Sequence, residues 1–347
     1  MIASNEKQNK QEETKMTNLN AVITKLQKFE AQKEDVLTKN IRVAYDGTFT
    51  IDGRYGYTAD DTTLAQVCKF FIPKGGSGYL QHCEPDMVAF NLNRWIGKKV
   101  EGREKPFFIR TRVDEGGNRI LRTIMSDQNA DLHQTVGNLA FLERILPALE
   151  AQDLKAESFH ITDHQMHLRL TNKTEVDVSV NKVGDIVKAG LHISNSETGL
   201  GSYKLLSLLY RLACLNGMIV GDALEKFNRA HRGNLDELYA FINNAIGKVH
   251  ETAFSVIDAV KASHNDMFYP EKVEAVLKYI TDKYGWTKKF NELIYTNFQN
   301  EEQSKFGVIQ AVTHSAKQFS GNDRLRIERQ ATDILTLDLN KLSFALN

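Results

Sequence analysis

Hydrophobic and polar residues alternate along short runs in the first two thirds of the chain, and such alternation is typical of half-buried β-strands. The run at 41–53 folds back at an Asp-Gly pair, which predicts a strand, a turn and a second strand. Two runs at 106–126 flank a Glu-Gly-Gly-Asn turn and predict the clearest hairpin of the sequence. A further hairpin is predicted at 158–172. We therefore expect these strands to form antiparallel sheets.

One apolar segment has two interpretations. Residues 187–196 predict a strand, and a Thr-Gly-Leu-Gly turn then leads into 204–215, where apolar residues occupy successive positions. A continuous apolar run is typical both of a buried strand and of a buried helix, and periodicity does not distinguish the two. The sequence leaves strand and helix open for 204–215.

Elsewhere, apolar residues recur every three or four positions, as on one face of an α-helix. We expect one helix capped by Thr62 or Thr63 and a second that begins at Pro85. The longest begins at Asn234 with a capping box and continues for about 28 residues, or roughly 40 Å at 1.5 Å per residue. Further helices are expected over residues 131–149, 270–284, 306–319 and 324–335.

These patterns predict an α+β fold, in which mainly antiparallel hairpins pack with helices and a largely helical C-terminal third follows. Residues 1–18 are rich in Lys, Glu, Gln and Asn, which is typical of a disordered leader, and a short amphipathic helix (19–36) comes next. We therefore divide the chain into a leader with this helix (1–40), an α+β core domain (41–221) and a helical region (222–347).

Charge and composition exclude several classes of protein. Lys and Arg total 44, as do Asp and Glu, so the net charge is zero and the chain is not one that coats a polyanion over its whole surface. Its polar start lacks the apolar part of a secretory signal, and no stretch is apolar over the roughly 20 residues that a membrane crossing needs. Three widely spaced cysteines form no CxxC pair and indicate a reducing compartment. We expect a cytoplasmic protein without membrane contact.

Few residues follow a pattern that indicates catalysis or metal binding. His160, His164 and His167 would share a face only on a helix, whereas their surroundings predict a hairpin with His164 in the turn and a solvated polar strand face. The glycine-rich loop at 74–78 matches no nucleotide-binding motif, and residues 198–202 are typical of a hairpin turn. We therefore expect no catalytic residue, no metal and no cofactor. The sequence leaves enzymatic activity open but favours a binding protein.

Positive charge is concentrated in one segment. Residues 97–122 carry eight Lys or Arg against four acidic residues. On the first strand of the predicted hairpin, Arg110 and Arg112 share a face with Phe108, and cations beside an aromatic platform are what a single-strand binder uses. The alternative is an exposed hairpin whose arginines pair with neighbouring carboxylates. The candidate nucleic-acid contacts of this segment are Lys98, Lys99, Arg103, Phe108, Arg110, Arg112, Arg119 and Arg122.

A second basic cluster precedes the predicted long helix. Lys226, Arg229, His231 and Arg232 lie just before its capped start, and helix N-termini attract anions. The cluster is either part of a phosphate site or a solvated loop. We include its four residues among the candidate contacts to nucleic acid.

Two segments resemble a known family. GLHISNSETGLGSYKLLSLLYRLACLNGMIVG, with its polar Ser-Asn-Ser-Glu turn and a Cys-x-Asn-Gly ending at Cys214, and the following His231-Arg232-Gly233 step are similar to the phage/plasmid-like family DUF932, a domain of unknown function. TLAQVCKFFIPKGGSGYLQHCEPDMVAFNLNRWI resembles an earlier part of that family. The likeness covers roughly residues 40–335 and implies a gene carried by a phage, a prophage or a plasmid. It implies no reaction and no catalytic residues.

Genes of mobile elements commonly serve DNA metabolism or the evasion of host defences, and this leads to two hypotheses. The first is a non-enzymatic protein that binds single-stranded DNA and supports annealing or recombination as a homo-oligomer. The alternative is an anti-defence or regulatory protein that binds a host protein through its long helices. A metal-dependent nuclease is a third interpretation, which no motif supports.

Overall fold

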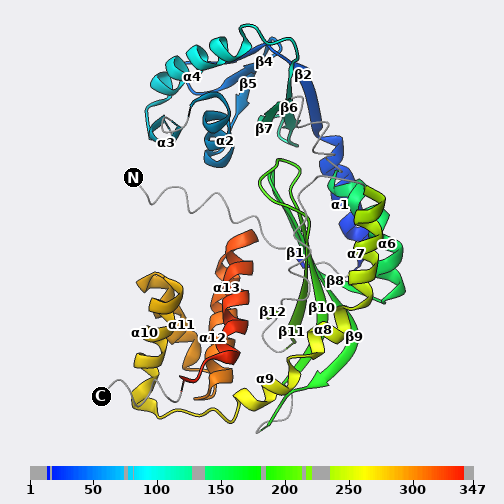
Figure 1. The fold of residues 1–347 in the computed structure, drawn as a ribbon, viewed down its shortest axis with the longest axis vertical. Coiled ribbons are helices and arrows are strands. Elements are labelled where there is room, and N and C mark those ends of the chain that lie inside the picture. The colour runs from blue at the N-terminus through cyan, green and yellow to red at the C-terminus, as the bar shows by residue number, and fades with distance from the viewer. Residues whose placement is uncertain are drawn as a thin grey trace.

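The computed structural model describes residues 14–15, 18–73, 77–80, 82–126, 137–180, 185–212, 216–220 and 235–339. Within these residues, two six-stranded sheets and a set of helices form an α+β fold, which confirms the predicted class. Figure 1 shows one sheet at one end of the molecule and a second, longer sheet in its middle, with the C-terminal helices beside it. We call them the N-terminal sheet and the central sheet.

The N-terminal sheet has the strand order β2-β6-β7-β5-β4-β3. Its neighbouring strands are antiparallel except for β5 and β7, which are parallel. The predictions of a turn-linked strand pair at 41–53 and of a hairpin at 106–126 are confirmed, as β3–β4 and β6–β7. The strands are β2 (Lys33–Thr38), β3 (Ile41–Val43), β4 (Phe49–Ile51), β5 (Arg54–Thr58), β6 (Phe107–Val113) and β7 (Arg119–Ser126).

Helices α2 (Asp61–Phe71), α3 (Ser77–Leu80) and α4 (Pro85–Val100) pack on one face of this sheet. The predicted start at Pro85 is confirmed. Asp60 caps α2 in place of Thr62 or Thr63, because Thr63 already lies in the first turn and its backbone N–H donates to the Asp60 carboxylate at 2.7 Å. The buried residues between sheet and helices include Phe49, Ile51, Val67, Leu92, Phe107 and Ile109.

The central sheet follows the order β1-β8-β9-β10-β11-β12, and every pair in it is antiparallel. The hairpin predicted at 158–172 is confirmed as β8–β9. Residues 204–211 are a strand, because their backbone pairs with β10 on one side and with β12 on the other. The strands are β1 (Thr14–Lys15), β8 (Lys155–Ile161), β9 (Met166–Asp177), β10 (Ile186–Asn195), β11 (Lys204–Arg211) and β12 (Asn216–Val220).

Three helices cover one face of the central sheet (Figure 1): α1 (Leu19–Ala31), α6 (Asn138–Ala151) and α7 (Leu235–Gly247). The sheet contributes apolar side chains at alternate positions, as its period of two requires. The buried residues of this layer include Val22, Leu26, Phe141, Phe159, Leu168, Leu191, Leu205 and Ile242.

The globular structure begins before residue 41, where the sequence placed its start. Helix α1 ends at Ala31 rather than at residue 36, because residues 33–38 pair with β6 as an edge strand. Leu19, Val22 and Leu26 of α1 are buried in the core of the central sheet. Thr14 and Lys15 add a short strand to β8, and residues 1–13, 16 and 17 of the predicted leader lie outside the described residues.

The opposite face of the central sheet is polar but not solvated, so the predicted solvated strand face is wrong. His160, His167 and His192 are buried there, and α13 (Gly321–Asp333) packs over this side at β12 and, through Gly321, beside His167. Arg169 donates to both carboxylate oxygens of Glu328 of α13, at 2.8 and 2.7 Å. Burial of the His192 ring lowers its pKa well below the ordinary value. On this face α13 therefore replaces water, and its Glu328 supplies the negative charge that pairs with the buried Arg169.

The predicted 28-residue helix is three helices, α7, α8 (Val249–Phe254) and α9 (Ile257–Ser263). Gly247 stands at the first interruption, where a residue of low helix propensity weakens the helix. The bend allows α7 to pack on α6 while α8 packs on β10 and β11. The chain thus follows the surface of the central sheet instead of crossing it in one line.

The remaining helices confirm the largely helical C-terminal third. They are α10 (Val273–Tyr284), α11 (Lys288–Phe298), α12 (Lys305–Ser315) and α13, with short 3-10 turns at Pro270–Lys272, Ala316–Gln318 and Ile334–Thr336. Helices α12 and α13 contact the edge strand β12. In the part of the chain that the structure describes, no helix has both the length and the apolar character to cross a membrane.

The end of α10 provides a test of the fold. Gly285 has the left-handed φ of +64°, and a Cβ built there meets nothing within 4 Å, so backbone strain is the only cost of a side chain. We expect Gly285→Ala to lower the free energy of unfolding by about 1 kcal/mol. Gly97→Ala, inside α4 and also unobstructed, is expected to raise it by a similar amount. Urea unfolding measures the free energy of unfolding of both variants. Changes of the same sign would contradict the left-handed conformation of Gly285 at the end of α10.

Candidate functional site

Three arginines of the β6–β7 hairpin point at two turns of the central sheet. Arg122 Nη2 donates to Glu197 Oε2 at 2.8 Å and its Nε donates to the Asp163 carbonyl at 3.0 Å. Arg112 donates to both carboxylate oxygens of Asp163, from Nε to Oδ1 and from Nη2 to Oδ2 at 3.1 Å. Arg110 Nη1 donates to the Glu197 carbonyl at 3.1 Å. The hairpin is therefore fastened to the β8–β9 turn through Asp163 and to the β10–β11 turn through Glu197.

Glu197 is the centre of this ion cluster. Its side chain is 0% exposed, and it accepts from Lys33 Nζ at 2.7 Å and from the backbone N–H of Asn138 at 2.6 Å, in addition to Arg122. Burial by itself would raise the pKa of Glu197, but the charges and hydrogen bonds of Lys33 and Arg122 outweigh burial and lower that pKa to about 2. The carboxylate is thus held ionised by partners from both sides of the junction.

Helix α2 joins the same junction. His164, in the β8–β9 turn as predicted, lies 2.8 Å from Asp60, the cap of α2. Gln66 Nε2 donates to the Thr198 carbonyl at 3.0 Å. His164 therefore faces the N-terminal sheet and not His160 or His167. Among the described residues, no group of three or more His, Cys, Asp or Glu side chains is arranged to hold a metal ion.

The open basic strand face expected around Phe108 is not formed. Arg110 and Arg112 are covered by the turns of the central sheet, and Arg122 is 0% exposed. Arg122 lies where the β6–β7 register shifts, between the pairs Arg110–Thr123 and Thr111–Leu121, and its side chain points toward the turns of the central sheet. The Arg110 guanidinium still lies 5.3 Å from the Phe108 ring. The alternative prediction was an exposed hairpin whose arginines pair with neighbouring carboxylates. The arginines do pair with carboxylates, but these partners are distant in sequence and the pairs are buried.

The other candidate contacts that the structure describes lie in two places. Arg119 is exposed at the start of β7 and donates to the Tyr55 carbonyl at 2.9 Å. Lys98, Lys99 and Arg103 lie at and just after the end of α4. Lys98 is exposed over Trp95, while Lys99 donates to the Phe70 carbonyl. Four candidates, Lys226, Arg229, His231 and Arg232, lie outside the described residues, as does most of the 74–78 loop.

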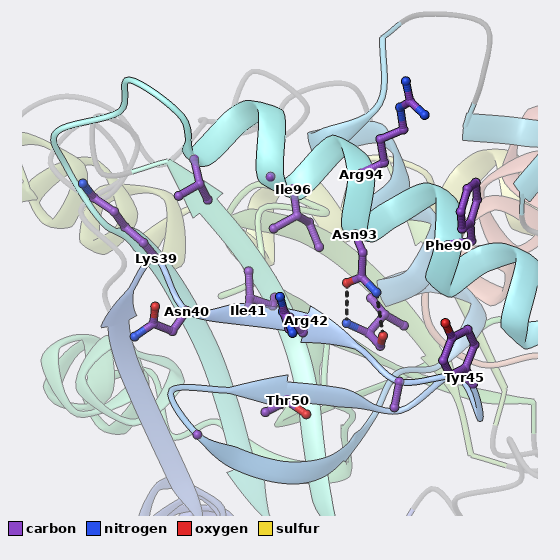
Figure 2. A pocket seen from close by; sticks show the side chains of 15 residues that line it. Lys39, Asn40, Ile41, Arg42, Tyr45, Thr50, Phe90, Asn93, Arg94 and Ile96 are labelled. Atoms are coloured by element: carbon purple, nitrogen blue, oxygen red, sulfur yellow. Dashed lines mark hydrogen bonds between the residues drawn. The ribbon is translucent and has the colours of Figure 1, made fainter.

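A groove of about 970 Å³ lies between the edge strand β3 and helix α4, as Figure 2 shows. Its charged lining residues are Lys39, Arg42 and Arg94, and no carboxylate lines it. Asp46 accepts hydrogen bonds from Thr48 of its own turn, and Asp52 accepts one from Thr38 at the end of β2. The lining of the groove therefore carries three positive charges and no negative one, in a chain of zero net charge.

Two aromatic side chains stand at one end of this groove. Tyr45 is 79% exposed and Phe90 is 65% exposed, and both line the groove. Figure 2 shows both at the same end of the groove, with Lys39 at the other end and Arg42 between. Lys39 donates to the Arg103 carbonyl, and Gly97 and Val100 line the groove, so the end of α4 with Lys98 and Arg103 borders it. Part of the basic segment identified in the sequence thus lies beside the groove.

Asn93 holds the two walls together. Its amide nitrogen donates to the Val43 carbonyl at 2.8 Å and its oxygen accepts from the Val43 N–H at 2.9 Å. An edge strand normally leaves such groups open for pairing with another strand. The amide of Asn93 takes the place of that strand and fixes α4 against β3.

Sequence reasoning missed both Glu197 and the groove. Glu197 lies in a run of five polar residues, Ser194 to Thr198, which follows an apolar strand, and a carboxylate in such a run was a detectable signal. Arg42, Phe90 and Arg94 gave no signal, because each occupies an ordinary exposed position on its own strand or helix. Only the packing of β3 on α4 brings them together.

A family model for a domain of unknown function (DUF932) matches residues 131–332, more than half of the chain. The chain belongs to this family. The DUF932 match runs from before α6 almost to the end of α13 and contains Asp163 and Glu197. Lys33, the three hairpin arginines and the groove precede it, so the match is narrower than the likeness read from the sequence. Neither curated proteins nor solved structures gave a match.

The ion cluster predicts a large effect of one neutralising substitution. Glu197→Gln removes the buried anion shared by Lys33 and Arg122, which keep only Glu30 and Asp163, and we expect it to lower the free energy of unfolding by about 3–5 kcal/mol. The matched control is Glu34→Gln, since Glu34 pairs with Arg54 at the surface and its loss is expected to cost less than about 1 kcal/mol. Guanidinium unfolding compares the two, and similar losses would show that Glu197 is not central.

The same carboxylate predicts loss of stability in acid. Its pKa is about 2 in the folded protein against an ordinary 4.5, so its ionised form stabilises the fold. That contribution, on the order of 3 kcal/mol, is fully present above about pH 5 and is lost as the pH falls from 4.5 toward 2. Unfolding measured between pH 7 and pH 3 should show this decline, and the decline should be smaller in Glu197→Gln. An equal decline in both proteins would place the titrating group elsewhere.

Proposed function

We propose that this DUF932 protein binds single-stranded DNA, without catalysing a reaction on it, through the groove between β3 and α4. The observation that carries the proposal is the lining of the groove: three cations, no carboxylate and two largely exposed aromatic rings. Nucleic-acid backbones attract cations at each phosphate, and unpaired bases stack on aromatic side chains. Lys39, Arg42 and Arg94 would contact phosphates while Tyr45 and Phe90 stack bases.

Several features favour a single strand over other polymers. The aromatic rings offer flat faces on which unpaired bases can stack, whereas the bases of a duplex already stack on one another. From Lys39 to Tyr45 the chain spans at most about 20 Å at 3.3 Å per residue, enough for several nucleotides. A peptide that added a strand to β3 would require the backbone groups of Val43, which Asn93 already occupies.

The biological setting belongs to the same proposal. The resemblance read from the sequence implies a phage or plasmid gene, and a non-enzymatic single-strand binder fits annealing or recombination in such a setting. Oligomers of the chain would place several grooves along one strand. The alternative of host-protein binding rested on long helices, and the longest of them is three short helices, packed on α6 (α7), on β10 and β11 (α8) and on α12 (α9). We therefore favour DNA.

Fluorescence anisotropy with a labelled single strand at several salt concentrations tests this proposal. We expect Arg42→Ala with Arg94→Ala to weaken binding at least tenfold and to reduce the salt dependence, because two phosphate contacts are lost. Phe90→Ala should weaken binding by about 1–3 kcal/mol with an unchanged salt dependence, because stacking releases no counterions.

The control is Lys278→Ala with Arg326→Ala, which removes two exposed cations on the C-terminal helices. Its affinity should match that of the unchanged protein. The proposal fails if the unchanged protein shows no salt-dependent binding at micromolar concentration, or if the control weakens binding as much as the groove variant does.

A further inference from the structure

Three buried histidines lie in a row across the polar face of the central sheet. His160, His167 and His192 come from the neighbouring strands β8, β9 and β10. The ring centres of His160 and His167 are 6.4 Å apart, and those of His167 and His192 are 5.4 Å apart. Imidazole is the side chain that ordinarily changes its charge near neutral pH. The protonation of these rings therefore decides how much charge is buried on this face.

Hydrogen bonds determine where the hydrogens of two of these rings lie. Gln165 Oε1 can only accept, so His167 Nε2, 3.1 Å away, carries a hydrogen and donates it. Nδ1 of the uncharged His167 ring then accepts from His192 Nε2 at 3.3 Å. His192 Nδ1 keeps a lone pair and has no hydrogen-bond partner among the described residues. An added proton would bind there and create a buried N–H group without an acceptor from those residues.

The groups that face this pair are mostly positive. Burial lowers the pKa of His192 well below its ordinary value, and neighbouring cations lower it further, namely His167 and Arg169 of β9, Arg324 of α13 and Lys204 of β11. The carboxylate on this side is Glu328 of α13, and it already accepts from Arg169 and Arg324. Because that anion is already shared, one more positive charge on the pair would add to an excess of positive charge.

Helix α13 begins directly beside the pair. A Cβ built on its first residue, Gly321, would lie 3.3 Å from His167 Nε2 and 3.6 Å from Gln165 Oε1. The N-terminus of a helix carries a partial positive charge. That end of α13 is compatible with an uncharged His167 ring and is repelled by a charged one. The docking of α13 and the protonation of the pair therefore oppose each other.

We propose that the His167–His192 pair is a pH-sensitive switch, which holds the start of α13 on the central sheet while it is uncharged and releases that helix end when it takes up a proton. In the released state water reaches the rings, and histidine then titrates near its ordinary pKa of 6.5. Docking is therefore fully stable above about pH 7.5 and weakens as the pH falls through 6.5. Glu197 responds only below about pH 5, so the two effects occupy separate pH ranges.

Hydrogen exchange of backbone amides in the full chain, corrected for the intrinsic exchange rate at each pH, tests this switch. For one histidine that titrates at pH 6.5 when released and stays uncharged when docked, the equilibrium constant for release rises about tenfold between pH 7.5 and pH 5.5. We therefore expect the amides of residues 325–329 in α13 to lose at least about tenfold of their protection. The amides of residues 89–96 in α4 should keep theirs.

Two substitutions locate the titrating group. His192→Gln keeps a donor for His167 but takes up no proton, so the loss of protection in α13 should become about tenfold smaller. His192→Asn serves the same purpose if the glutamine variant does not fold. The matched control is His314→Gln, because His314 lies half-buried on α12, which packs on α13, and burial also lowers its pKa. This control should lose as much protection as the unchanged protein.

Three results would overturn the inference. They are an unchanged protection of α13 at pH 5.5, an equal loss in the unchanged protein and the His192 variants, and a loss that is as large in α4 as in α13. The last would show that acid unfolds the whole chain rather than releasing one helix. The experiment contains no DNA, and Arg42→Ala with Arg94→Ala should behave as the unchanged protein does. Failure of the DNA proposal therefore leaves this one intact.

Discussion

The buried carboxylate of Glu197 is the constraint on which the arrangement of the two sheets depends. It accepts hydrogen bonds from Lys33, from Arg122 and from the first turn of α6, so three separate parts of the chain meet at one anion. Burying so many charges is costly, and the cost is offset only where every partner is in place. Such a junction favours one relative position of the sheets over all others, because any displacement leaves a charge without its partner.

This constraint also decides where positive charge remains available. Arg110, Arg112 and Arg122, three of the eight basic residues of 97–122, face the β8–β9 and β10–β11 turns and form ion pairs there. Arg42 and Arg94, which are scattered in sequence, face outward on the other side of the N-terminal sheet and line a groove without a carboxylate. The net charge of zero therefore conceals two basic regions of different kinds, one neutralised inside the protein and one left at its surface.

The central sheet repeats the same physical solution on its polar face. Arg169, under α13, is matched by Glu328, which also accepts from Arg324 at 2.9 Å. A sheet with one apolar and one polar face would normally leave the polar face to water. Here helices cover both faces, and the covering helix supplies the carboxylate that the buried arginine requires. The alternation of polar and apolar residues in these strands therefore identifies the polar face of the sheet but does not show whether solvent reaches that face.

The sequence by itself determined the α+β class, the hairpins at 106–126 and 158–172, the helical C-terminal third and the resemblance to DUF932. These depend on local periodicity and turn residues, which act over a few positions. Only the tertiary structure decided that 204–211 is a strand, that Arg122 turns inward, and that residues 39–45 meet residues 90–100 in a groove. Each of these depends on which distant segment pairs with or covers the residues concerned, and such contacts leave no periodic trace in the chain.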